Sequence, residues 1–156
     1  MRIRRSLAED YPAFARLFLD LATGDPTPSF DRWRDELADA SLVAEDDRGL
    51  VVGYAYAEVL RGTGYVRQLV VDAEARGRGV GRALLEDVAS RFAEAGCATW
   101  QLNVAPDNGP ARRLYRGLGM VDGLFSWVLR FPWSRVGSLP RAEGVRVSPV
   151  EPREDD

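Results

Sequence analysis

Short apolar runs alternate along the chain with segments whose apolar residues recur every three or four positions, a pattern typical of strands and amphipathic helices in turn. The runs predict strands at residues 2–5, 41–45, 50–60, 65–71 and 98–104, with one or two more within 123–131. In the third run, alternation puts Tyr54, Tyr56 and Glu58 on one face and small residues on the other.

Four helices are expected between these strands. Their approximate ranges are 7–22, 30–38, 80–95 and 110–118. Ser6-x-x-Glu9 has the spacing of a capping box, which places the first helix start near Leu7. Gly96 and Gly119 are expected to end the last two helices.

The stretch 65–85 joins a β-branched strand to a helix through a glycine-rich turn. Gly77, Gly79 and Gly81 stand at alternate positions, so the turn's N–H groups lack covering side chains and point at whatever lies over the helix start. Such a turn favours an anion.

Three arginines around this turn narrow the choice of anion. Arg76, Arg78 and Arg82 favour a pyrophosphate over a single carboxylate. A P-loop would need Lys and then Ser or Thr where Arg82-Ala83 stands, and a Rossmann turn needs two residues between its second and third glycines, where one stands. A tight turn capped by arginines, with no ligand, is the alternative.

Composition argues against several classes of function. A chain of 156 residues with 46% hydrophobic and 29% charged residues has the size and balance of one soluble domain. Its formal charge of −3 argues against general nucleic-acid binding. The sequence has no histidine, the commonest general base and zinc ligand, so a metallohydrolase or serine hydrolase is not expected, and no metal site is predicted.

Cysteine usage and hydropathy predict a cytoplasmic protein without a membrane partner. The single cysteine, Cys97, cannot form an intrachain disulfide and is expected to be a small core residue. Arg16 and Asp20 interrupt the first apolar segment, so no secretory signal is expected, and no apolar run has the length of a membrane span.

Two segments, in this order, resemble the GNAT superfamily of acetyl-coenzyme A-dependent N-acetyltransferases. Arg76-x-x-Gly79-x-Gly81 is similar to the family's pyrophosphate-binding motif. Asn108-x-x-Ala111-x-x-x-Tyr115-x-x-x-Gly119-Met120 resembles its second conserved segment, with Met120 in place of the usual Phe. The resemblance extends from about Arg2 to Phe131.

The resemblance implies an α/β (α+β) fold with a mixed, mostly antiparallel sheet of six to seven strands and about four helices. Two strands, those ending at 69–71 and 101–104, would separate to form the acetyl-coenzyme A slot. The N–H of Val70 would face the thioester oxygen. The implied cofactor contacts are Leu69, Val70, Val71, Arg76, Gly77, Arg78, Gly79, Val80, Gly81, Arg82, Asn103, Asn108, Ala111 and Tyr115.

Catalytic roles follow from the same resemblance. Tyr115 would protonate the coenzyme A thiolate, since its reference pKa of about 10 keeps it protonated at neutral pH. A plain helix-face tyrosine and a helix-capping Asn108 are the alternatives. Many members carry a carboxylate where this chain has Arg67-Gln68. Glu58 is then the best general base, directly or through water, or else a solvated strand glutamate.

The acceptor wall of the family corresponds to the first two helices. Phe18, Phe30 and Trp33 are therefore candidates for acceptor contact, and core packing explains these helix aromatics equally well. Tyr56, on the third predicted strand, is a further candidate for acceptor contact. The expected acceptor is a primary amine on a small molecule or peptide. An amine of low pKa, such as an α-amino group near 7.7–8.0, would need no strong base.

The expected reaction is direct transfer of an acetyl group to that amine in a ternary complex. A non-catalytic acyl-coenzyme A-binding module is the alternative, favoured by the missing strand carboxylate and opposed by Tyr115. Transfer to a hydroxyl is a third. Homodimers are common in the family, so a homodimer is a further expectation.

Residues 132–156 differ in character from the expected N-acetyltransferase domain at 1–131. Four prolines with few apolar residues between them predict an extended tail. Because residues 144–149 faintly resemble 1–5, a remnant or the start of a second similar unit is the alternative.

Overall fold

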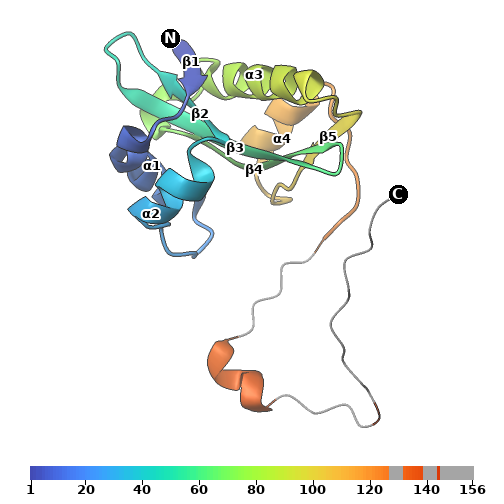
Figure 1. Ribbon diagram of the computed structural model, residues 1–156. Helices are drawn as coiled ribbons and strands as arrows, with labels where there is room; N and C mark the ends of the chain where they lie inside the picture. Colours follow the sequence, from blue (N-terminus) through green and yellow to red (C-terminus); the bar gives the residue numbers. More distant parts are fainter. Residues whose placement is uncertain (127–131, 139–143, 145–156) are drawn as a thin grey trace. The chain divides into compact units, whose positions relative to one another are not determined.

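The computed structural model describes residues 1–126, 132–138 and 144, and the chain divides into two compact units, Met1–Val121 and Asp122–Asp156. A single sheet, whose strand order follows the chain, organises the first unit (Figure 1). Its strands are β1 (Arg2–Arg5), β2 (Ser41–Glu45), β3 (Val51–Leu60), β4 (Thr63–Val71) and β5 (Thr99–Leu102).

The predicted mixed, mostly antiparallel sheet is confirmed. Strands β1 to β4 pair antiparallel, and β4 pairs parallel with β5. The described residues form five strands rather than the six to seven expected. Residues 123–126 are not in a strand, and the rest of the last predicted strand, 127–131, lies outside the described residues.

The predicted helices are all present, with small changes at their ends. The first opens with the 3-10 turn η1 (Ala8–Asp10), continues as α1 (Tyr11–Phe18) and closes with η2 (Leu19–Leu21). The second starts as α2 (Phe30–Arg32) and widens into the π-helical turn η3 (Trp33–Leu37). The others are α3 (Val80–Glu94) and α4 (Gly109–Arg116), with short 3-10 turns η4 (Ala73–Ala75) and, in the second unit, η5 (Trp133–Ser138).

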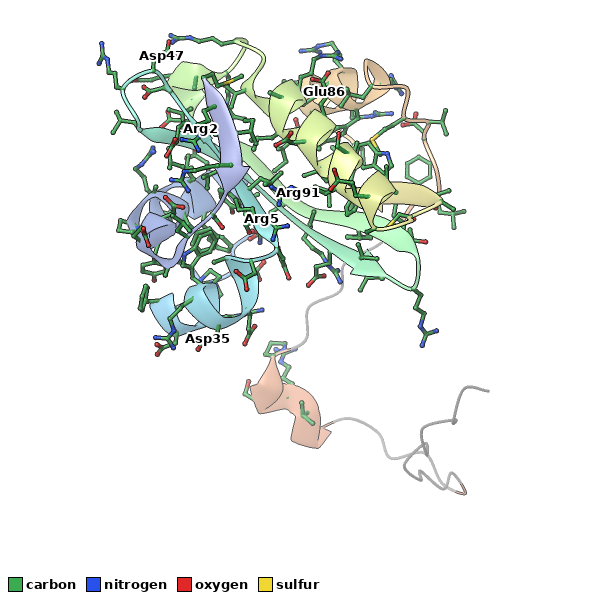
Figure 2. The ribbon with its side chains drawn as sticks, turned by 45° about the horizontal axis from the view of Figure 1, so that its top comes forward. Arg2, Arg5, Asp35, Asp47, Glu86 and Arg91 are labelled. Carbon is green, nitrogen blue, oxygen red and sulfur yellow. The ribbon has the colours of Figure 1, made fainter. Side chains whose placement is uncertain are left out.

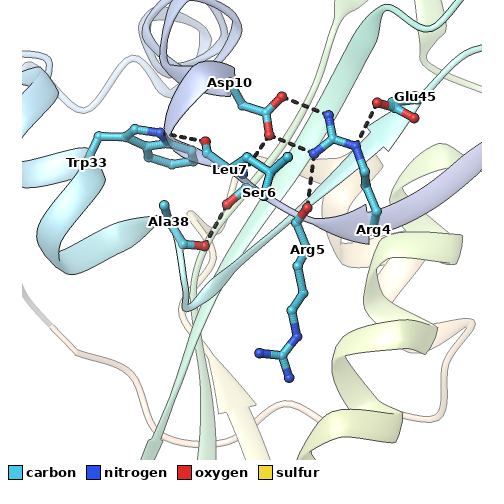
Figure 3. A network of polar contacts seen from close by, with 8 residues as sticks. All are labelled: Arg4, Arg5, Ser6, Leu7, Asp10, Trp33, Ala38 and Glu45. Carbon is cyan, nitrogen blue, oxygen red and sulfur yellow. Dashed lines mark hydrogen bonds and ion pairs between the residues drawn. The ribbon is translucent and has the colours of Figure 1, made fainter.

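The start of the first helix differs from the predicted capping box by one residue (Figure 3). The Leu7 N–H donates to the Asp10 carboxylate at 2.8 Å. The Ser6 hydroxyl instead donates to the Ala38 carbonyl at 2.6 Å, tying this turn to the end of the second helix. Arg4 holds Asp10 from β1 with two hydrogen bonds of 2.7 and 2.8 Å. Burial opposes ionisation of Asp10, but these donors hold its pKa below the ordinary value.

The sheet separates two hydrophobic clusters. On one face, α3 and α4 cover a cluster that includes Val66, Leu84 and Phe92. On the other face, α1 and η3 pack Phe14 and Trp33 against Tyr54, and Figure 1 shows α1 and α2 on the side of the sheet away from α3. The Phe14 and Trp33 rings stack with centroids 4.3 Å apart, so each side of β4 has its own core.

The C-terminal half of α3 passes over β1, where the two elements bring like charges together. Arg5 at the end of β1 and Arg91 on α3 both line a hollow of about 370 Å³, and Figure 2 labels them on these neighbouring elements. Burial, together with the charge of Arg5, lowers the pKa of Arg91. This hollow lies toward the opposite end of α3 from the glycine turn.

Candidate active site

Strands β4 and β5 part in the middle of β4. Their pairing runs from Thr63↔Thr99 to Val66↔Leu102, whereas β4 continues to Val71. The β3–β4 register also shifts here: Tyr56 faces Gln68 and Ala57 faces Val66, so Arg67 is the extra residue of a β-bulge. The separation of strands expected from the sequence is therefore present, and within the described part of the chain one edge of residues 67–71 has no strand partner.

The amides that point to this open edge are not the predicted ones. The Asp72 N–H donates to the Val52 carbonyl at 2.9 Å, and Val70 faces Tyr54. Because donors alternate along an antiparallel ladder, the Val70 N–H also points at β3, whereas those of Leu69 and Val71 point away from it. The expected thioester donor, Val70 N–H, is corrected to these neighbours.

The glycine turn after β4 presents the N-terminus of α3. Gly77 and Gly79 have φ angles of 74° and 85°, which side chains rarely adopt. Ala83 makes the first helical hydrogen bond, to the Gly79 carbonyl at 3.0 Å. The N–H groups of residues 80–82 precede it, so they lack acceptors within the helix and remain available for an anion.

Gly81 has a different role from the other two glycines. A Cβ at Gly81 would lie 3.2 Å from Leu114 Cδ2 and 3.6 Å from Val71 Cγ2, whereas a Cβ at Gly77 or Gly79 would meet no atom within 4 Å. The third glycine therefore lets α4 approach α3 and β4 closely. The sequence motif alone does not separate these two uses of glycine.

The three arginines of the turn are held to different degrees. Arg76 Nε donates to the Val71 carbonyl at 2.9 Å, and its Nη2 lies 3.2 Å from Asp20. Arg82 Nη2 donates to the Gly117 carbonyl at 3.2 Å, which links α3 to the end of α4. Arg78 is exposed. Arg76 and Arg82 therefore brace the turn, and Arg78 extends into solvent beside it.

The second motif positions Tyr115 through both ends of α4. Asn108 Oδ1 accepts from the Ala111 N–H at 3.2 Å and caps the helix, as the capping alternative proposed. At the other end, the Met120 N–H donates to the Tyr115 carbonyl at 3.1 Å and Gly119 has a φ of 84°, a Schellman motif that confirms Gly119 as the helix-ending residue. Tyr115 is half-buried against the α3 cluster, and burial raises its pKa.

A polar cluster lies on the opposite face, where β3 meets the bulge. Glu58 accepts from Arg67 Nε at 2.7 Å and from the Tyr56 hydroxyl. These two donors hold the pKa of Glu58 below its ordinary value, with the Tyr56 bond the larger cause. The Arg67 guanidinium lies over the Tyr65 ring at 4.5 Å, and Asn103 Nδ2 donates to the Tyr65 hydroxyl at 2.7 Å.

The sequence did not single out Arg67 and Tyr65 as site residues. Their spacing carries the signal, because residues two apart on a strand share a face and Glu58 pairs directly across from Tyr65. The pattern became visible only once the hairpin register was known.

The four predicted acceptor-contact residues fall into two groups. Trp33 is fully buried, its Nε1 donates to the Leu7 carbonyl at 3.1 Å, and Phe18 is buried beside Phe14. These two residues are core, so their expected contact with the acceptor is corrected. Phe30 is 44% exposed, and Tyr56 is half-buried within the polar cluster, so these two remain accessible to a ligand.

Several features bear on other chemistry. Cys97 is half-buried at the edge of the α3 cluster and has no disulfide partner. Among residues 1–126, 132–138 and 144, no group of His, Cys, Asp or Glu could hold a metal ion. No helix in this described part has both the length and the apolar character to cross a bilayer.

The open edge of β4 and the N-terminus of α3 fit the two ends of an extended ligand. Leu69 and Val71 offer backbone groups suited to an amide-containing arm. The N–H groups of residues 80–82 suit a pyrophosphate. These are the features that coenzyme A requires of a site.

Comparison with known proteins identifies relatives that are acetyltransferases. The Acetyltransferase (GNAT) family matches residues 2–120. L-2,4-diaminobutyric acid acetyltransferase of Streptomyces coelicolor is 30% identical over 128 residues, which cover 74% of this chain and 71% of that protein.

Solved structures share the fold. Diaminobutyrate acetyltransferase from Paenibacillus lautus, determined with L-2,4-diaminobutyric acid and coenzyme A, is 27% identical to this chain and superposes with a TM-score of 0.64. The match covers 75% of this chain and 73% of the Paenibacillus chain. Ribosomal-protein-alanine N-acetyltransferase from Brucella melitensis biovar Abortus is 25% identical and superposes with a TM-score of 0.66. This match covers 84% of this chain and 100% of the Brucella chain. The divergent β4–β5 pair, the glycine turn and the family match together place this chain in the GNAT family of acetyl-coenzyme A-dependent N-acetyltransferases.

Proposed function

We propose that this chain transfers the acetyl group of acetyl-coenzyme A directly to a primary amine, with donor and acceptor bound together. The observation that carries the proposal is the parting of β4 and β5 after Val66 and Leu102. One edge of this opening adjoins the N–H groups of residues 80–82 at the start of α3. The polar cluster of Glu58 and Arg67 lies on the opposite face of the sheet from α3. Donor and acceptor can therefore approach one another from opposite sides.

The cofactor would lie along the open edge of β4. Acetyl-coenzyme A supplies the acetyl group as an activated thioester. Leu69 and Val71 would bind the pantetheine arm through their backbone groups, and one of their amides would stabilise negative charge on the thioester oxygen. Gly77, Gly79 and the amides of residues 80–82 would hold the pyrophosphate, with Arg78 as its mobile counter-charge.

Tyr115 would donate the proton that the departing thiolate needs. Its raised pKa keeps the phenol protonated at neutral pH, which a general acid requires. The Schellman motif fixes its backbone within the last turn of α4. Asn108 and Ala111 would position that helix rather than take part in the proton transfer.

Glu58 would act on the acceptor. Because Tyr56 and Arg67 hold it ionised, it attracts an ammonium group and can receive a proton from the amine, directly or through water. Its lowered pKa makes it a weak base. The arrangement therefore favours an acceptor amine that loses its proton easily.

The test is the initial rate of coenzyme A release across a panel of amino acids, diamines, polyamines, aminoglycosides and short peptides. Tyr115→Phe should lower kcat by about 100-fold with little change in acetyl-coenzyme A affinity. Tyr11→Phe is the matched control, since the Tyr11 hydroxyl donates to the Pro28 carbonyl at 3.0 Å, remote from α4.

Full turnover in Tyr115→Phe would remove Tyr115 from the mechanism. No release with any acceptor, while acetyl-coenzyme A still raises the melting temperature, would favour the acyl-coenzyme A-binding module instead.

A further inference from the structure

Arg67 stands at the point where the site opens. It is the bulged residue of β4, follows directly after the last β4–β5 pair, and precedes Leu69 by two positions. Its side chain joins Glu58 and Tyr65 on the face away from α3. A ligand group bound to Arg67 would therefore sit close to the proposed reaction centre without occupying the cofactor's side of the sheet.

The guanidinium is fixed, yet most of its donors remain available. Glu58 Oε2 accepts from Nε at 2.7 Å, and the Tyr65 ring lies 4.5 Å below Cζ. Among residues 1–126, 132–138 and 144, no acceptor bonds to either terminal guanidinium nitrogen, Nη1 or Nη2. The side chain is 43% exposed. Arg67 thus presents its two terminal NH2 groups to solvent, in a fixed plane.

A carboxylate is the ligand that matches this arrangement. The paired N–H groups of a planar guanidinium fit the two oxygens of a carboxylate, and fixing the plane in advance reduces the entropy lost on binding. Stacking on Tyr65 supplies that fixation.

Glu58 adds a second charge of opposite sign beside the first. Two donors hold it, Tyr56 on Oε1 and Arg67 on Oε2, and an ionised carboxylate can accept about four hydrogen bonds. Glu58 can therefore also attract an ammonium group. A ligand that carries both a carboxylate and an amine satisfies both residues.

We propose that Arg67 binds a carboxylate on the acceptor, so that the preferred acceptors are small amino acids with a reactive amine rather than simple amines or polyamines. This inference rests on the proposed function, because it names the acceptor class of the same site. It also assigns a role to the arginine that stands where many family members have a carboxylate.

The experiment compares two acceptors that differ only in the carboxylate. They are 2,4-diaminobutyrate and 1,3-diaminopropane, its decarboxylated form, each assayed at saturating acetyl-coenzyme A with wild type, Arg67→Gln and the control Arg48→Gln, an exposed residue of the β2–β3 turn. The wild type should prefer the acid in kcat/KM. Arg67→Gln should lower that value about 10- to 100-fold for the acid and less than threefold for the diamine. Arg48→Gln should change neither.

Equal losses for both acceptors in Arg67→Gln would overturn the proposal, because they would indicate a structural role. A wild type that prefers the diamine would also overturn it, as would equal use of dipeptides whose carboxylate is distant from the amine. The melting temperature of Arg67→Gln should stay close to that of wild type, since an exposed ion pair contributes little to stability.

A binding measurement separates this inference from the proposed function. Isothermal titration of each acceptor into the coenzyme A complex reports carboxylate recognition without turnover. If the acid binds through Arg67 but nothing is acetylated, the acceptor inference holds and the proposed catalysis fails. If the acid neither binds nor reacts, the inference fails.

Discussion

Alanine substitutions at Gly79 and Gly81 should separate the two roles of the glycine turn. At Gly79, the N-cap of α3, φ is 85° and an added Cβ would meet nothing within 4 Å. The cost is therefore conformational, about 1 kcal/mol for a non-glycine residue in the left-handed region. Relaxation of that strain would turn the N–H groups of residues 80–82 away from the pyrophosphate. Gly79→Ala should lower both stability and acetyl-coenzyme A affinity.

Gly81→Ala should behave differently, because its backbone is already helical. The new methyl would lie 3.2 Å from Leu114 Cδ2, which must move by a few tenths of an ångström. Overpacking costs about 1 kcal/mol at its lower limit, and Ala is favoured over Gly in a helix by about 1 kcal/mol. The two effects nearly cancel in stability. Since Leu114 adjoins Tyr115 on α4, displacement of the phenol should lower kcat by about tenfold.

Three measurements test this division: urea unfolding, titration calorimetry with acetyl-coenzyme A, and steady-state kinetics. Gly79→Ala should lose affinity, and Gly81→Ala should lose kcat while its affinity stays within about threefold of wild type. If Gly81→Ala lost affinity and kept kcat, the Cα of Gly81 would face the pyrophosphate rather than Leu114, and the packing argument would be refuted.

Two further predictions concern stability. Asp10→Asn removes the buried, charged partner of Arg4 and should lower the free energy of unfolding by about 2 kcal/mol at pH 7. Because the folded-state pKa of Asp10 is lowered, the stabilisation by its carboxylate is present above the unfolded pKa near 3.9 and is lost as pH falls below that value. Urea unfolding should therefore find a smaller difference between variant and wild type at pH 3 than at pH 7, and an equal difference at both pH values would contradict the prediction. Gly64→Ala would place a Cβ 2.4 Å from Phe92 Cδ2 and should lower the free energy of unfolding by about 1–3 kcal/mol, whereas the control Gly123→Ala, which meets nothing within 4 Å, should leave the melting temperature unchanged.

Local pattern was enough to predict most elements of the first unit. The apolar runs placed β2 and β3 within one residue of their observed ends, and Gly96 ends α3 as expected: its φ is 73°, and the Cys97 N–H bonds back to the Phe92 carbonyl at 2.9 Å. These features depend on periods of two or 3.6 residues and on the left-handed conformation that glycine allows, and a single sequence carries both.

Features that depend on tertiary contacts were harder to predict. Trp33 and Phe30 lie three residues apart in one short helix, yet the first is fully buried and the second 44% exposed. Their difference arises from Phe14 and Leu7, which lie more than 15 positions away. Ser6 likewise does not cap the helix: its hydroxyl donates to the distant Ala38 carbonyl, and the capping contact forms between Leu7 and Asp10.

The bulge at Arg67 determines which amides of β4 face the open edge, and they are not the Val70 amide that the family resemblance implied. The Ala57 N–H donates to the Ala40 carbonyl at 3.1 Å, so the Ala57↔Val66 pair exchanges no hydrogen bonds and the Val66 N–H points toward β5. Without the inserted residue, counting onward by two from Val66 would bring the Val70 N–H to the open edge. The inserted residue reverses that parity, and Leu69 and Val71 face the open edge instead.

The same insertion has consequences for both substrates. It ends the pairing with β5, which opens the edge proposed for the cofactor arm, and it sets Arg67 and Gln68 on one face, since Gln68 accepts from the Tyr54 hydroxyl at 3.0 Å on the side away from α3. One extra residue in β4 therefore directs two amides toward the proposed donor and a guanidinium toward the proposed acceptor. Because a bulge is visible only in the register between strands, neither consequence follows from the period of the sequence alone.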